Sequence, residues 1–292
     1  MNVRCYMERA MRANRRLMSD LGLAEDTPAG GRLAQVDVYC RYHREQFQGS
    51  TLTVEGGVLS VGPEAISTYY EVLNPAKGQV AATYIVANAL IAPATGETLE
   101  LPEAVRLAAA AERVELPAHG RARTIDLADP RQDLALEALA ARLIDDPSDP
   151  MSRRSEWTVA AESCDEHGFL VDSGAMMFGG WRPPSAEEMR QHGPMTFTGD
   201  EGHRLGWASL ETRMVRFGPV RAGETLCSIG GEISLQPKVR HSRRWLFSAT
   251  SGRLVSINDN VSIALDLDAR RPMDIPPTIR GRLESRHVPE FA

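Results

Sequence analysis

The loop Cys164–Gly168 (CDEHG) carries the residue types of this chain best suited to catalysis. It precedes a predicted helix, whose N-terminal amides and dipole favour negative charge. A carboxylate at such a place can activate water or attack an electrophile directly. The dipole would lower the pKa of Asp165, whereas burial against Phe169 and Met176 would raise it. The loop therefore indicates a hydrolytic site, and a purely structural role for Asp165 as a cap is the alternative.

The N-terminal residues predict a helix of the kind that must position such a loop. Apolar residues from Val3 to Leu21 are mostly three or four positions apart, and Gly22 stands where a helix would end. This pattern predicts an amphipathic helix of about five turns. Its apolar face needs a partner surface.

An internal repeat supplies that surface. Residues 49–92 align without a gap on residues 223–266, 174 positions later, with eight identities in 44 positions. Roughly three identities would be expected by chance. Both copies show a Gly-x-Thr-Leu turn, a short strand with Gly-Gly, a second strand, a glycine turn and a long apolar strand. We expect each copy to be one helix followed by three or four antiparallel strands.

The second copy contains elements that the first copy lacks. A strand at 157–162 and the loop Cys164–Gly168 precede its helix, which two prolines interrupt. The first copy begins after the position where both would stand, so we expect its first strand and loop to be missing and the true start codon to lie upstream. The sequence predicts a first domain at 1–92, a linker with helices at 93–154, and a second domain at 155–292.

Composition excludes several classes of protein. A net charge of −6 argues against a duplex nucleic-acid binder. The four cysteines show neither CxxC nor zinc-type spacing, so we expect reduced thiols, no metal and no cofactor. The longest apolar run, 80–92, is too short for a membrane span, and charged residues interrupt the N-terminus throughout. We expect a soluble cytoplasmic protein.

An Asp-x-x-Gly loop before a helix, followed by strands with glycine turns, resembles the hotdog fold of acyl-CoA thioesterases of the 4-hydroxybenzoyl-CoA thioesterase-like group. Members often read Asp-x-x-Gly-His-Met-Asn into the helix; residues 165–168 match the first four positions and Met1-Asn2 the last two. The resemblance implies an α+β fold in which an antiparallel sheet wraps a long helix. Two copies resemble a tandem double hotdog, a pseudo-dimer with sites at the seam between its halves.

The resemblance also implies roles for single residues. Asp165 matches the catalytic carboxylate, and Gly168 matches the glycine where the backbone approaches the thioester. The helix N-terminus near Asp172 would offer an N–H to the carbonyl oxygen. Asn2 keeps the Asn of the motif, whereas Phe169 stands where many members have His, and Val follows where they have Asn.

Other side chains are candidates for binding or for replacing Asp165. The substrate-binding candidates are Glu166, His167, Phe169, Lys238 and Arg240, of which the last two belong to a basic cluster that could meet the phosphates of CoA or could simply be solvated. Glu8 fits a surface ion pair, Cys164 fits an inert buried thiol, and His203 only vaguely resembles a hydratase motif.

We therefore predict an acyl-CoA thioesterase that releases free acid and CoA with help from a carboxylate. The alternative is a non-hydrolytic hotdog protein that binds an acyl thioester or acts as a partner subunit, and an enoyl-CoA hydratase is third. The expected partner is the acyl-CoA substrate, without nucleic acid or membrane. The sequence leaves open the acyl group, the activity of the first half and the oligomeric state, for which a homodimer of double-hotdog chains is one option.

Overall fold

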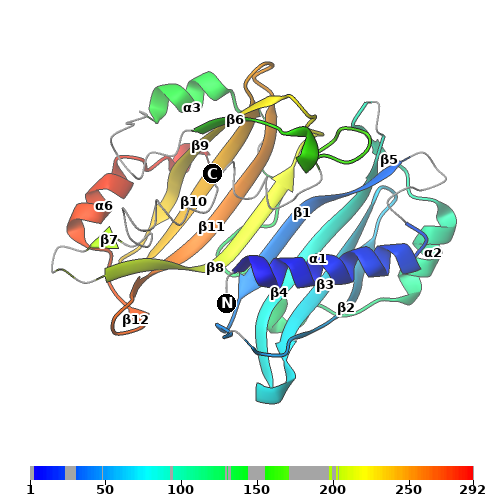
Figure 1. The fold of residues 1–292 in the computed structure, drawn as a ribbon, viewed down its shortest axis with the longest axis horizontal. Helices are drawn as coiled ribbons and strands as arrows, with labels where there is room; N and C mark the ends of the chain where they lie inside the picture. Colours follow the sequence, from blue (N-terminus) through cyan, green and yellow to red (C-terminus); the bar gives the residue numbers. More distant parts are fainter. Residues whose placement is uncertain are drawn as a thin grey trace.

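The computed structural model shows one large antiparallel sheet that runs through the molecule (Figure 1). Among the described residues it has 12 strands, with the main path β2-β3-β4-β1-β8-β11-β10-β9-β6. The short strands β5, β7 and β12 pair with β4, β8 and β11. The structure describes residues 3–23, 31–47, 49–92, 95–128, 130, 133–143, 155–170, 197–198, 202 and 204–291.

The elements divide into two halves and a connection. The first half contains α1 (Val3–Asp20), β1 (Arg32–Tyr42), β2 (Thr53–Val61), β3 (Ala65–Asn74), β4 (Gln79–Ile91) and β5 (Thr98–Leu99). The connection contains α2 (Glu103–Ala111) and α3 (Leu136–Arg142). The second half contains β6 (Ser155–Thr158), β7 (Phe197–Thr198), β8 (Arg204–Arg216), β9 (Thr225–Leu235), β10 (Val239–Ser248), β11 (Leu254–Asp266), β12 (Arg271–Pro272) and α6 (Pro277–Glu284).

Helix α1 lies across one face of the first-half strands (Figure 1). Its buried side chains Met7, Ala10, Met11 and Met18 follow the three-to-four-residue spacing of the sequence. The helix ends before Gly22, whose φ of 89° is readily adopted only by glycine. The predicted amphipathic helix and its glycine stop are confirmed.

The repeat is visible in the strand boundaries. β3 and β10 lie 174 residues apart at both ends, and β1 and β8 end 174 residues apart. β1 pairs with β8 at the centre of the sheet, where Tyr39 lies opposite Arg213, its own counterpart at that offset. This register relates the halves by an approximate twofold axis through the Tyr39–Arg213 pair.

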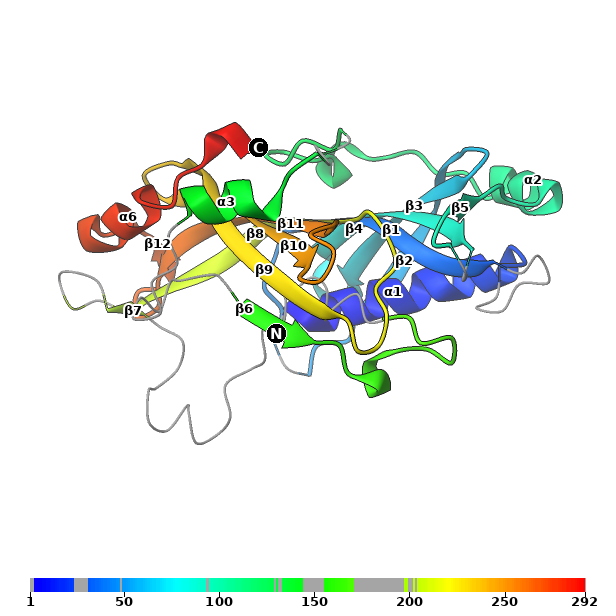
Figure 2. The same cartoon turned by 90° about the horizontal axis from the view of Figure 1, so that it is seen from above.

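The connection crosses the sheet on the face opposite α1 (Figure 2). Glu211 of β8 accepts backbone N–H groups from residues 123–125 at 3.1–3.3 Å. Arg213 donates to the carbonyl oxygens of residues 126–128 at 2.8–3.2 Å. Both helical stretches predicted for this region are present, as α2 and α3. No helix in the described ranges has the length and hydropathy of a membrane span.

Candidate active site at the seam between the two halves

The loop that contains Asp165 folds back on itself. The backbone N–H of Asp165 donates to the carbonyl of Phe169 at 2.8 Å, and the N–H of Gly168 donates to the carbonyl of Asp165 at 2.9 Å. Gly168 has a φ of 77°, so the turn itself requires glycine. Leu170 N–H donates to Val220 O at 2.9 Å, which ties the loop to the segment after β8.

The two oxygens of the Asp165 carboxylate have different surroundings. Oδ1 accepts the N–H groups of His167 at 3.1 Å and Phe169 at 2.8 Å, which fixes the carboxylate against its own loop. Oδ2 is buried and makes no hydrogen bond within the described part of the chain. It faces Nη1 of Arg32 at 3.5 Å, and the Arg32 and Asp165 side chains are only 11% and 18% exposed.

Arg32 comes from the other half of the molecule, at the start of β1. Its guanidinium lies 5.1 Å from the ring centre of Phe169, whose ring also contacts the guanidinium of Arg221 at 4.1 Å. Burial lowers the pKa of Arg32 from its ordinary value, and the charge of Asp165 opposes that shift. Since arginine titrates far above neutral pH, Arg32 remains a cation. The seam therefore holds a buried cation, an aromatic ring and a carboxylate together.

A cavity of about 80 Å³ adjoins this group. Residues of both halves line it, and these include Arg32, Ala34 and Ile91 from the first half and Leu170, Arg216 and Val220 from the second half. Arg216 Nη2 donates to the carbonyl of Leu170 at 3.4 Å. The cavity has two arginines at its wall among mainly aliphatic neighbours, so it can hold a small group that develops negative charge.

The other predicted loop residues lie around Asp165. Glu166 and His167 are exposed, with side chains 70% and 49% accessible and 3.9 Å apart. Phe169 is buried, so its ring supports Arg32 rather than facing the solvent. Asn2, Asp172 and His203 lie outside the described residues.

Lys238 and Arg240 lie far from Asp165. Lys238 precedes β10 and Arg240 stands near its start, whereas the Asp165 loop lies near the segment before β9, at the other end of these strands. A ten-residue strand such as β10 is roughly 30 Å long. Lys238 is half exposed and lies 3.9 Å from Asp274. The structure does not bring the basic cluster to the seam.

The basic cluster at 238–244 is not a single surface either. Successive strand residues face opposite sides of a sheet. Arg240 is buried and bonded to Glu232 on one face, whereas Arg243 is bonded to Asp259 on the other. The guanidinium of Arg240 already has a buried carboxylate partner, so Arg240 is not part of the candidate site.

Two alternatives to Asp165 have ordinary surroundings. Glu8 is exposed on α1. Cys164 is partly buried, its thiol contacts the carbonyl of Ala160 at 3.6 Å, and burial with the nearby charge of Asp165 raises its pKa. A raised pKa keeps a thiol protonated and unreactive. The described residues contain no group of three or more His, Cys, Asp or Glu placed to bind a metal.

Arg32 and Arg216 were not among the candidates predicted from the sequence. Arg32 begins the first strand after α1, and Arg216 ends the matching strand of the second copy. No spacing in the sequence connects either residue to Asp165. The pairing of β1 with β8 at the centre of the sheet, which the structure shows, is what brings the two residues to the seam.

The fold and the site together define a class of protein. Two matching sheets joined edge to edge, with a long helix on one face and a candidate site at the seam, form a double hotdog of α+β type. Residues 1–109 match the sequence model of the thioesterase-like superfamily. No curated protein matches the sequence.

Solved structures share the fold over nearly the whole chain at low sequence identity. The 12:0-ACP thioesterase from Umbellularia californica has a TM-score of 0.61 and 11% identity, with 89% of this chain and 86% of that chain covered. An oleoyl thioesterase (putative) from Lactobacillus plantarum has a TM-score of 0.59 and 11% identity, with 89% and 88% covered. An acyl-ACP thioesterase from Bacteroides thetaiotaomicron has a TM-score of 0.58 and 10% identity, with 90% of each chain covered. The predicted fold and the resemblance to hotdog thioesterases are confirmed.

Proposed function

We propose that this protein hydrolyses an acyl thioester of CoA or of an acyl carrier protein, with Asp165 as general base. The observation that supports this most directly is the asymmetric carboxylate. Oδ1 is fixed by two backbone N–H groups, while Oδ2 is directed at the cation of Arg32 beside a cavity shared by both halves. The superfamily match of residues 1–109 and the solved thioesterases of the same fold agree with this proposal.

The reaction balances with groups that the site offers. Oδ2 of Asp165 takes a proton from water as the water oxygen bonds to the carbonyl carbon. Negative charge then develops on the carbonyl oxygen, where Arg32 and Arg216 can stabilise it in a site with little solvent. The C–S bond breaks, and the departing thiolate receives the proton held by Asp165. The products are a free acid and a free thiol.

The first experiment is release of free thiol from short, medium, long and aromatic acyl-CoAs, with the matching acyl carrier protein thioesters as a second series. In Asp165→Asn the amide oxygen can still accept the two loop N–H groups, but the base is lost. We expect turnover to fall roughly a hundredfold or more.

Asp20→Asn is the matched control, because the same change is made at an exposed carboxylate of α1 that pairs only loosely with Arg16 at 3.9 Å. It should keep full activity. Full activity in Asp165→Asn would exclude Asp165 as the base.

A second function is favoured by the same carboxylate. Both oxygens of Asp165 already serve the structure, one as the acceptor for the loop and one as the ion-pair partner of Arg32. A protein that binds an acyl thioester without hydrolysis needs no general base, so these two structural roles of Asp165 are sufficient for it. Binding of the thioesters without turnover on either carrier would support this function.

A further inference from the structure

The cavity beside Asp165 lies where the two central strands of the sheet separate. The pairing of β1 with β8 begins at Asp37, so residues 32–36 of β1 precede the first pair. Arg32, Ala34 and Val36 line the cavity from this part of β1, and residues 216–220 line it from the other half. The cavity is therefore a gap in the seam itself, formed by both halves.

The wall of this cavity changes from partly exposed to buried. Arg32 and Arg216, which carry its charge, are partly exposed. Ala34, Leu170 and Val220 line the same cavity and are buried, with side chains at most 5% exposed. A ligand can therefore enter from the solvent beside the two guanidinium groups and place an apolar end against the three buried side chains.

A contact between the halves closes the cavity on one side. Gly96, in the turn between β4 and β5, packs so closely on Pro219 that a Cβ at residue 96 would overlap the proline ring. Both residues line the cavity, so the two halves touch at its wall. A longer ligand could pass this point only by separating the halves.

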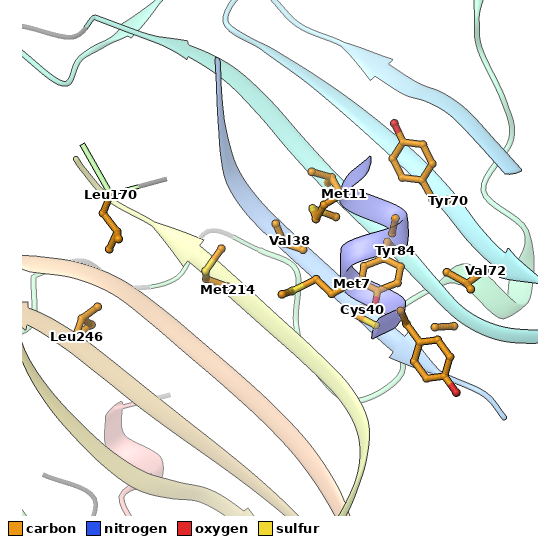
Figure 3. Close-up of a cluster of buried hydrophobic side chains, with 14 of the residues drawn as sticks. Met7, Met11, Val38, Cys40, Tyr70, Val72, Tyr84, Leu170, Met214 and Leu246 are labelled. Atoms are coloured by element: carbon orange, nitrogen blue, oxygen red, sulfur yellow. The ribbon is translucent and has the colours of Figure 1, made fainter. Parts of the chain in front are cut away.

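The hydrophobic layer beneath α1 bounds the cavity on another side. Met7 and Met11 of α1 lie over the strands beside Val38 and Tyr84 in one buried cluster (Figure 3). Leu170 belongs both to this cluster and to the wall of the cavity. A chain that outgrew the cavity on this side would have to displace packed side chains, which is unfavourable in a dense core.

The volume of the cavity sets the size of the group that fits. It is about 80 Å³. An apolar cavity of about 150 Å³ accommodates benzene, so the same proportion leaves room here for roughly three or four non-hydrogen atoms. The pantetheine arm of a thioester is several times larger than this. The cavity therefore fits the acyl end of a thioester and excludes its carrier end.

We propose that this cavity holds the acyl group, and that the substrates are short-chain acyl thioesters of about two to four carbons. This proposal rests on the proposed function, which places the carbonyl oxygen at Arg32 and Arg216, and it names the substrate class. The alkyl carbons then extend to Ala34, Leu170 and Val220, where their burial is favourable. A longer chain exceeds the space and overpacks the seam.

The repeat supplies matched variants. Ile91→Ala widens the cavity, because Ile91 lines it. Leu265→Ala is the control, since Leu265 occupies the same position 174 residues later, is likewise partly exposed and does not line the cavity. Ala34→Val makes the opposite change by narrowing the cavity, and its control is Ala208→Val at the corresponding position of β8.

The test is calorimetric binding of acetyl-, butanoyl-, octanoyl- and dodecanoyl-CoA, with the same acyl groups on acyl carrier protein as a second series. It is measured in Asp165→Asn so that no hydrolysis is needed. We expect the butanoyl thioester to bind at least about tenfold more tightly than the octanoyl thioester. In that background Ile91→Ala should reduce or reverse this preference, and Ala34→Val should weaken binding of butanoyl more than of acetyl. Leu265→Ala and Ala208→Val should leave both ratios unchanged.

Equal or tighter binding of the octanoyl or dodecanoyl thioester would overturn the proposal, as would binding of none of the esters on either carrier. A preference for butanoyl that neither Ile91→Ala nor Ala34→Val changes would place the selection outside this cavity, which also overturns it. Failure of hydrolysis alone is distinguishable, because the wild type would then release no thiol while the binding preference and its change in the two cavity variants persist.

Discussion

At the scale of single residues, the loop around Asp165 depends on one glycine conformation. Gly168 and Gly281 both have open space where a Cβ would be placed, so a methyl group at either position meets nothing. They differ in the backbone, since Gly168 has a φ of 77° and Gly281 lies inside helix α6. Alanine substitutions at these two positions therefore separate the effect of backbone conformation on stability from the effect of side-chain packing.

We expect Gly168→Ala to destabilise the protein by about 1 kcal/mol, because a side chain strains the left-handed conformation. Gly281→Ala should stabilise it by about 0.5–1 kcal/mol, because alanine is the better helix former. Urea unfolding of both variants measures these values. Equal changes in the free energy of unfolding would contradict the requirement for a positive φ at residue 168. A loss of turnover in Gly168→Ala alone would show that this turn holds Asp165 in place.

At the scale of elements, Glu211 ties the connection to the centre of the sheet. Its carboxylate accepts three backbone N–H groups from residues 123–125 and the hydroxyl of Tyr39 at 3.0 Å. Burial alone would raise the pKa of Glu211, but these four donors outweigh burial and lower it overall. A carboxylate with a lowered pKa stabilises the fold in its charged form.

We expect Glu211→Gln to reduce the free energy of unfolding by roughly 1–3 kcal/mol at neutral pH. Because the pKa is lower in the folded state, this contribution is present above the unfolded pKa of about 4.3 and disappears as the pH falls through the folded value. The difference between wild type and variant should therefore narrow below about pH 4. Denaturant unfolding across this pH range tests the sign.

Glu290→Gln is the control for this prediction. Glu290 is half exposed and pairs with Arg142 at 3.1 Å on the surface. Its loss should change stability by less than about 0.5 kcal/mol. If the difference in unfolding free energy between wild type and Glu211→Gln did not change with pH, the stabilisation could not come from the charged form of Glu211.

At the scale of the whole molecule, the two halves are joined by a continuous sheet and by a pair of related contacts at its centre. Arg213 of the second half bonds to Asp37 of the first at 2.6 Å, and Tyr39 of the first half bonds to Glu211 of the second. Asp37 and Glu211 occupy the same position of the repeat. The contacts therefore follow the approximate twofold axis.

This arrangement predicts that the halves unfold together. All four tryptophans lie in residues 155–292, so their fluorescence reports on the second half, whereas circular dichroism reports on the whole chain. The two transitions should coincide in the wild type. Arg213→Met removes the Asp37 pair and the bonds to the connection, and we expect a loss of about 3–5 kcal/mol with separated transitions. Transitions that already differ in the wild type would exclude a single cooperative unit.

The sequence by itself determined the local structure. Helix α1 follows from apolar spacing that ends at Gly22, and the strands follow from apolar runs between glycine turns, because these signals act over a few residues. The 174-residue repeat also determined that two similar sheets would form, and it placed Asp165 in a loop.

The tertiary structure alone decided which groups meet. Arg32 reaches Asp165 because β1 and β8 pair at the centre of the sheet, and no spacing in the sequence encodes that distance. The tertiary structure also divides the basic cluster, since strand alternation separates Arg240 from Arg243 and gives each a buried acid partner. Sequence neighbours share a run of charge, but the pleat and the register determine which charges share a surface.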